Sequence, residues 1–262
     1  MSEPAVLATR EWNPSETYAP APRVAVLVHG IVGWSRTWWR LGPALVERGF
    51  RAVGIDLRGH GQSPRIDGSA TARSLADDVA RTLSRLGLES ADALIGHSLG
   101  AAVVMELADA RRGLARRLVL EDPPGQTRAD DVEFQRTLER EVLAARNDPD
   151  AEVRRELSEN PRWQPEDADQ NVEGRAMCDL EGILASLRAN TGVRAPDLVA
   201  RLRVPALYLV ADAERSALGA ERQRLIESVP PGSRAVELDS GHTIHRDRFD
   251  DYLASVLDWL GR

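Results

Sequence analysis

The feature that most constrains the fold is the stretch 92–102, where an apolar run ends abruptly in Gly-His-Ser-Leu-Gly and passes into a helical pattern. A strand, a sharp turn and a helix in this order leave little space beside the turn, so glycine is needed at Gly96 and Gly100, where a Cβ would meet the backbone. The turn lifts the Ser98 hydroxyl out of the sheet edge and aims the Leu99 amide toward the same space. We therefore predict that Ser98 is a nucleophile and that the Leu99 N–H faces a developing oxyanion.

Short apolar runs alternate with helical patterns along most of the chain. The expected strands are 24–28, 51–55, 91–95, 117–120, 205–210 and 234–238, with 5–12 as an edge strand. The expected helices are 35–48, 69–87, 101–112, 217–229 and 249–260. Strands separated by helices predict an α/β fold with a doubly wound, mostly parallel sheet. Ligands of such sheets bind outside the carboxyl ends of the strands.

The alternation of strands and helices breaks after Pro124 and resumes after Arg203. Between them the sequence is rich in charge, and its apolar residues keep a helical spacing, as at Phe134, Leu138 and Val142. We therefore expect a helical insertion at 125–200 in a core domain formed by 1–124 and 201–262. Acidic and basic residues lie close together in the insertion, so we expect its charges to form a solvated face.

Composition excludes several classes of function. The 262 residues carry a net charge of −7, which argues against a nucleic-acid or anionic-membrane surface. The chain contains no lysine, so lysine Schiff-base chemistry is excluded. Cys178, the only cysteine, rules out an internal disulfide and lies in an apolar pattern typical of a buried thiol. The N-terminus lacks a basic start and a long apolar core, and no apolar run approaches a membrane span. We expect a cytoplasmic protein.

A serine nucleophile needs a base, and His242 is the strongest candidate. It follows the last predicted strand, on a loop that can bring an imidazole over the strand ends. His245, one helical turn later, is the second candidate for the base; otherwise we expect a surface or insertion-facing side chain there. The remaining histidines are His29 and His60, expected to make structural hydrogen bonds, and His97, expected to point away from its neighbour Ser98.

The base in turn needs a carboxylate to hold its tautomer. Asp122 follows the strand 117–120, and Asp212 and Glu214 follow the strand 205–210. Each lies at a carboxyl end, so spacing alone leaves all three open.

Four motifs together resemble the α/β-hydrolase superfamily. They are His29-Gly30 after a strand, Asp56-x-Arg58-Gly59-His60-Gly61-x-Ser63, Gly96-His97-Ser98-Leu99-Gly100 and the late Gly241-His242. The resemblance covers nearly everything outside 125–200, where such proteins usually insert a cap. It implies that Ile31 supplies a second oxyanion-hole amide. Its register favours Glu214 as the acid, although some relatives place the acid where Asp122 stands here.

Serine at the elbow argues for acyl transfer to water, because similar capped enzymes that open epoxides or displace halide carry aspartate there. We therefore expect a serine hydrolase that cleaves an ester, lactone or thioester of a small to medium, largely apolar molecule. The alternatives are a cofactor-free C–C hydrolase or perhydrolase on the same triad, and a non-catalytic ligand-binding protein. Val32, Trp34 and Trp163 are candidate substrate-binding residues. We expect a small-molecule substrate with no metal and no organic cofactor, and the sequence does not indicate an oligomeric state.

Overall fold

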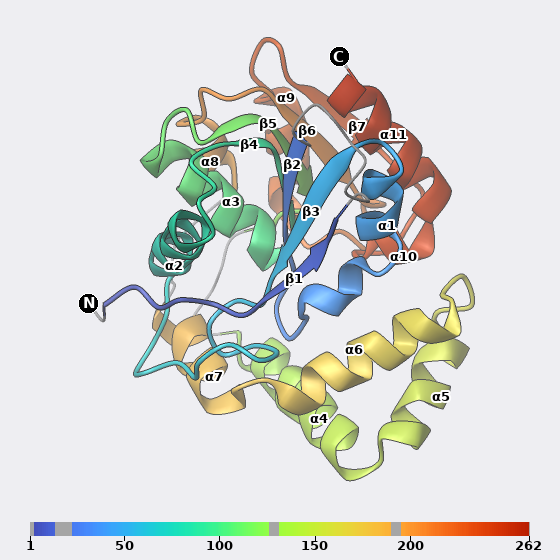
Figure 1. Cartoon of the computed structure of the whole chain (residues 1–262). Helices are drawn as coiled ribbons and strands as arrows, with labels where there is room; N and C mark the ends of the chain where they lie inside the picture. The colour runs from blue at the N-terminus through green and yellow to red at the C-terminus, as the bar shows by residue number, and fades with distance from the viewer. Residues whose placement is uncertain (1–2, 14–22, 126–130, 190–194, 262) are drawn as a thin grey trace.

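The computed structural model describes residues 3–13, 23–125, 131–189 and 195–261, which contain one seven-stranded sheet (Figure 1). Its strands are β1 (Thr9–Trp12), β2 (Arg23–Val28), β3 (Phe50–Ile55), β4 (Ala91–His97), β5 (Ala115–Glu121), β6 (Ala206–Val210) and β7 (Arg234–Glu237). The strand order is β1-β3-β2-β4-β5-β6-β7; β1 runs antiparallel to β3, and the other neighbouring pairs are parallel. The predicted α/β fold with a mostly parallel sheet is confirmed.

Helices cover both faces of this sheet. One face packs against α2 (Ala72–Arg85), α3 (Leu99–Ala110), α8 (Ala195–Val199) and α9 (Arg222–Glu227), and the other against α1 (Leu41–Val46) and α11 (Phe249–Gly261). Within β2, Val26 and Val28 join the first core while Ala25 and Leu27 join the second. This two-residue alternation is why each strand is apolar throughout its buried part.

The helix expected over 35–48 is instead two short pieces, a 3-10 turn η1 (Ser35–Trp38) followed by α1. Pro43 has no N–H to donate to the preceding turn, which favours a break before α1. Gly42 also packs closely against the Trp12 indole, where a Cβ would lie 2.7 Å from Cε2 of the ring. A second short 3-10 turn, η2 (Gly219–Glu221), precedes α9 within the helix expected over 217–229.

The region expected to be an insertion contains α4 (Val132–Asn147), α5 (Pro149–Glu159), α6 (Pro165–Met177) and α7 (Leu180–Ala189), which we call the insert helices. In Figure 1 they lie below the sheet, apart from the helices that flank it. Asp148 separates α4 from α5: it ends the first helix, and its side chain accepts from the Ala151 N–H at 3.0 Å to start the second. In the described part of the chain, no helix is both long and apolar enough to cross a membrane.

Candidate active site

Ser98 occupies a strained turn between β4 and α3. Its backbone has φ 51° and ψ −118°, a conformation that residues other than glycine rarely adopt, and its side chain is buried. A Cβ on Gly96 would lie 2.6 Å from the Gly100 carbonyl carbon, and a Cβ on Gly100 would lie 2.5 Å from the His29 carbonyl oxygen. The prediction that these two glycines are required by close backbone approach is confirmed.

The loop after β2 lies directly against Ser98. A Cβ on Gly30 would be 3.2 Å from the Ser98 Cβ, and the loop closes through a hydrogen bond from the Gly33 N–H to the Gly30 carbonyl at 3.1 Å. Val32, inside this turn, has φ 54°. The half-buried Ile31 therefore sits beside the serine, as does Leu99, the first residue of α3.

His242 is held by Asp122. The His242 Nδ1–H donates to Asp122 Oδ2 at 2.6 Å, from the loop after β7 to the residue that follows β5. The Asp122 carboxylate is fully buried, whereas about a third of the His242 side chain is exposed. Because Nδ1 carries the proton, Nε2 is left with its lone pair free to accept one.

The Asp122 carboxylate is an acceptor for three further donors. Oδ1 accepts from the Ala211 N–H at 3.1 Å and from the Ser216 hydroxyl at 2.6 Å, and Oδ2 accepts from the Ala217 N–H at 2.7 Å. The backbone of Asp122 has φ 36°, so its geometry is strained as well as buried. These contacts fix the carboxylate before any substrate binds.

The other two candidate acids lie elsewhere. Glu214, which the resemblance favoured, has an exposed side chain, and its backbone N–H donates to Asp212 Oδ1 at 3.0 Å. The Asp212 side chain thereby closes its own turn. Of the three carboxylates, the structure pairs His242 with Asp122.

His245 forms a second histidine–carboxylate pair, which the sequence did not reveal. Its Nδ1 lies 2.8 Å from Glu121 Oε1, its backbone N–H donates to the same oxygen at 2.9 Å, and its Nε2 lies 3.1 Å from the Thr37 hydroxyl. Both His245 and Glu121 are buried. The expected surface or insertion-facing position for His245 is therefore wrong. The adjacent acids Glu121 and Asp122 at the end of β5 receive one histidine from the loop after β7 and one from the short helix α10 (Ile244–Asp247) that follows it.

The remaining histidines make the structural contacts expected of them. His29 Nδ1–H donates to the Gly30 carbonyl at 2.7 Å, and its Nε2 accepts from the Leu57 N–H at 3.0 Å. His60 Nδ1–H donates to the Arg58 carbonyl at 3.0 Å, and burial lowers the pKa of His60 to about 3. His97 donates from Nε2 to the His242 carbonyl at 3.1 Å, and burial lowers its pKa well below the usual value. His97 thus supports the backbone of the loop that carries His242.

Two cavities meet at Ser98 and His242, which line both of them. The first has a volume of about 390 Å³ and is bordered mainly by apolar side chains, among them Ile31, Leu99, Phe134, Ile183 and Leu198. The second, of about 320 Å³, runs between the loop after β2 and the insert helices, and many of its side chains are charged. The serine is therefore located at a junction between an apolar and a polar space.

The candidate substrate-binding residues differ in where they lie. Val32 and Trp163 line the second cavity. Trp34 lines neither cavity in the described chain; it is buried, and its indole N–H donates to the Gln170 carbonyl at 3.1 Å. The expectation that Trp34 binds substrate is not supported, because its side chain packs between the core and α6. Within the residues that the structure describes, no group of three or more His, Cys, Asp or Glu side chains could hold a metal ion.

Comparisons with known proteins show which family the chain belongs to. A family model described as alpha/beta hydrolase fold matches residues 24–175. An uncharacterized protein of Mycobacterium tuberculosis is 38% identical over 111 residues, which are 42% of this chain but only 31% of that relative's length. The sn-1-specific diacylglycerol lipase ABHD11 of Danio rerio is 24% identical over 249 residues, covering 90% of this chain and 77% of the lipase. A solved structure of a thermophilic esterase from Thermogutta terrifontis is 25% identical with a TM-score of 0.73, covering 97% of this chain and 93% of the esterase. The chain therefore belongs to the alpha/beta hydrolase fold family.

Proposed function

We propose that this protein is a serine hydrolase that cleaves a carboxylic ester, or a related lactone or thioester, through an acyl-enzyme on Ser98. The observation that carries the proposal is the strained serine of the β4–α3 turn, which lines the same cavity as a histidine held by a buried carboxylate. A serine hydroxyl is a weak nucleophile by itself and becomes reactive when a neighbouring base takes its proton.

In the proposed reaction, Ser98 Oγ attacks the substrate carbonyl while His242 Nε2 accepts its proton. Asp122 holds the imidazole in the tautomer that leaves Nε2 free and stabilises the imidazolium that forms. The backbone amides of Ile31 and Leu99 are proposed to stabilise the oxyanion of the tetrahedral intermediate, since both residues border Ser98 and Leu99 begins a helix. His242 then protonates the leaving group and activates the water that releases the acid.

Three observations support an ester with an apolar acyl part. The 390 Å³ cavity falls within the range of small-molecule sites, and its border is mainly apolar. Phe134 of α4 and Ile183 of α7 line it, which supports the proposal that the insert helices act as a cap over residues of the core domain. The names of the zebrafish lipase and the Thermogutta esterase describe ester hydrolysis in those proteins.

The test is hydrolysis of p-nitrophenyl acetate, butyrate and hexanoate by the wild type and by Ser98→Ala. We expect turnover by the wild type and a loss of about 10³-fold or more in the variant, the scale seen when a nucleophile is removed. A stoichiometric burst of p-nitrophenol would identify the acyl-enzyme. Wild-type turnover no faster than that of Ser98→Ala would contradict the proposal for these esters.

A further inference from the structure

Phe134 of α4 borders both of the cavities that meet at Ser98. In the part of the chain that the structure describes, the residues that line both spaces are Ile31, Ser98, Phe134 and His242. Three of them come from loops at the carboxyl end of the sheet and already have a part in the proposed reaction. Phe134 is the fourth, and it comes from the insert helices. The insert therefore contributes one aromatic side chain to the junction that the proposed reaction uses.

The start of α4 is held in place by its cap and by its apolar face. The Asp131 side chain accepts from the Phe134 N–H at 3.0 Å and so begins the helix. Leu138 and Val142 follow at intervals of four residues, which places them on the same face of the helix. Both are buried and pack with Val32 of the loop after β2. These contacts fix α4 against that loop, which itself lies beside the site.

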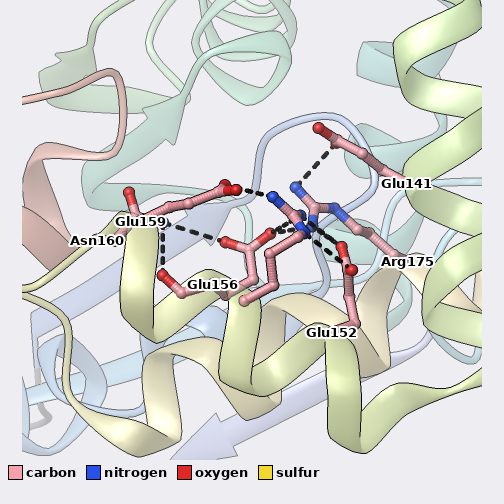
Figure 2. Close-up of polar contacts among 7 residues, drawn as sticks. Glu141, Glu152, Glu156, Glu159, Asn160 and Arg175 are labelled. Carbon is pink, nitrogen blue, oxygen red and sulfur yellow. Dashed lines mark hydrogen bonds and ion pairs between the residues drawn. The ribbon is translucent and has the colours of Figure 1, made fainter.

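Ion pairs join α4 to the neighbouring insert helices (Figure 2). Arg175 of α6 contacts Glu141 of α4 at 3.0 Å and also the buried Glu156 of α5. The sequence predicted a solvated face for the charges of the insert. These three side chains instead face one another, because the charge pattern of one helix does not show where its neighbours pack. The helix that carries Phe134 is thus held by polar as well as apolar contacts.

The Phe134 ring keeps much of its surface open. Phe134 is 43% exposed, whereas Leu138 on the same face is buried. The other large apolar side chains that are exposed in the described residues are Val6, Val132 and Leu143, and none of them lines either cavity. A substrate that enters the cavities would cover part of the Phe134 ring, and removing apolar surface from water favours binding. The ring is therefore available for contact with a substrate.

The chemistry of an ester determines which part of the substrate passes this ring. When the carbonyl carbon lies at Ser98, one branch begins with the α-carbon of the acid and the other begins with the ester oxygen. The ester oxygen carries one further substituent, whereas the α-carbon carries up to three. A side chain at the junction therefore meets bulk mainly at the α-carbon. Additional methyl groups there need space that a closely packed protein does not provide without displacement.

We propose that Phe134 is a specificity-determining residue that selects acids without branching at the α-carbon. An unbranched acyl chain passes the ring into the apolar cavity and covers the open surface of the ring. A quaternary α-carbon pushes against the ring and moves the carbonyl away from Ser98 Oγ. The preferred substrate is thus an ester of an acid that is linear next to its carbonyl. This inference rests on the proposed ester hydrolysis at Ser98.

The experiment compares p-nitrophenyl pentanoate with p-nitrophenyl 2,2-dimethylpropanoate, whose acyl groups are isomers with the same number of carbon atoms. Release of p-nitrophenol is followed, and each kcat/KM is divided by the rate constant for hydroxide-catalysed hydrolysis of the same ester, which removes the difference in intrinsic reactivity. We expect the wild type to prefer the pentanoate at least tenfold. Equal normalised values would overturn the inference while leaving ester hydrolysis intact. No hydrolysis of either ester above the Ser98→Ala level would instead overturn the proposed function.

A pair of variants separates contact with the substrate from a structural role of the helix. Phe134→Ala and Val132→Ala both shorten exposed apolar side chains in the first turn of α4, but Val132 lines neither cavity. In Phe134→Ala we expect kcat/KM for the branched ester to rise at least threefold and the preference for the pentanoate to fall at least fivefold. Val132→Ala should keep the preference within twofold of the wild type.

The rise in activity on the branched ester is the decisive readout, because loosened helix packing would lower the rates for both esters. The inference is overturned if Phe134→Ala keeps the wild-type preference or loses activity on both esters equally. A change of preference in Val132→Ala as large as that in Phe134→Ala would overturn it as well.

Discussion

Replacing Asp122 by asparagine tests the geometry of the site most directly, because the change keeps the size of the side chain and removes its charge. The carboxylate accepts four hydrogen bonds, two at each oxygen. An amide has one oxygen, so its NH₂ group must take the place of the other. In place of Oδ1 the NH₂ group faces the N–H of Ala211, and in place of Oδ2 it faces the N–H of Ala217.

Each orientation of the asparagine has a predictable cost. With the NH₂ group toward His242, Nδ1 must accept rather than donate, so Nε2 carries the proton and can no longer take one from Ser98. We therefore expect kcat to fall about 10³- to 10⁴-fold, or about 4–5.5 kcal/mol of transition-state stabilisation. Each buried donor left unpaired costs about 1–3 kcal/mol, so the free energy of unfolding should fall by about 2–4 kcal/mol, and the variant should remain folded.

The assay compares Asp122→Asn with Glu214→Gln and Asp212→Asn, using p-nitrophenyl butyrate turnover together with urea unfolding. We expect Glu214→Gln to stay within threefold of the wild type, because its side chain is exposed and the His242 Nδ1–H donates to Asp122 instead. The reasoning is refuted if Asp122→Asn keeps activity within tenfold of the wild type while either of the other variants loses it.

Three further predictions concern stability and reactivity. Gly100→Ala places a methyl group against the carbonyls of Val28 and His29, so it should lower the free energy of unfolding by about 1–3 kcal/mol and the Tm by several degrees. Gly261→Ala, which has open space around its Cβ, should change the Tm little. Equal losses of Tm in the two variants would contradict the packing argument. The pKa of His60 is about 3 in the folded protein and about 6.5 unfolded, so the unfolded chain binds the extra proton between these values and stability is lost as the pH falls below 6.5. From pH 7.5 to 5.5 this one histidine should remove about 1.4 kcal/mol, a loss that urea unfolding of His60→Gln should lack; the same pH dependence in both proteins would count against it. Burial raises the pKa of Cys178 to about 11. Iodoacetamide at pH 8 should therefore modify the native thiol at least about a hundredfold more slowly than the urea-unfolded thiol. Similar rates of modification would show that the thiol is not buried.

Local patterns in the sequence were sufficient to predict the sheet and the turn at Ser98. A strand buried on both faces is apolar throughout, and the close backbone approach at Gly96 and Gly100 allows no side chain, so both features appear in adjacent residues. The pairing of His242 depends instead on how far the loop after β7 reaches across the sheet. The loop passes Asp212 and Glu214, which follow the neighbouring strand β6, and its histidine binds Asp122, which follows β5 one strand further along the sheet. No local sequence pattern predicts how far across the sheet a loop extends.

The ion pairs of Arg175 in α6 with Glu152 and Glu156 in α5 illustrate the same limit for charged residues (Figure 2). Glu152 and Glu156 lie one helical turn apart, a spacing that suits an exposed face as well as it suits a buried one. Only the packing of α5 against α4 and α6 decides between the two. The second pair, His245 with Glu121, was likewise hidden because β5 and the helix α10 are far apart in sequence and meet only in the folded protein.

The neighbouring residues Glu121 and Asp122 anchor the loop after β7 and the adjoining helix α10 at two points, through His242 and His245. A loop fixed at one point can rotate about its anchor, but one fixed at two cannot turn without breaking both contacts. The segment that carries His242 should therefore open and close together with the end of β5, as one cooperative unit in hydrogen exchange. The His245 amide, bonded to a buried carboxylate at 2.9 Å, would report that opening.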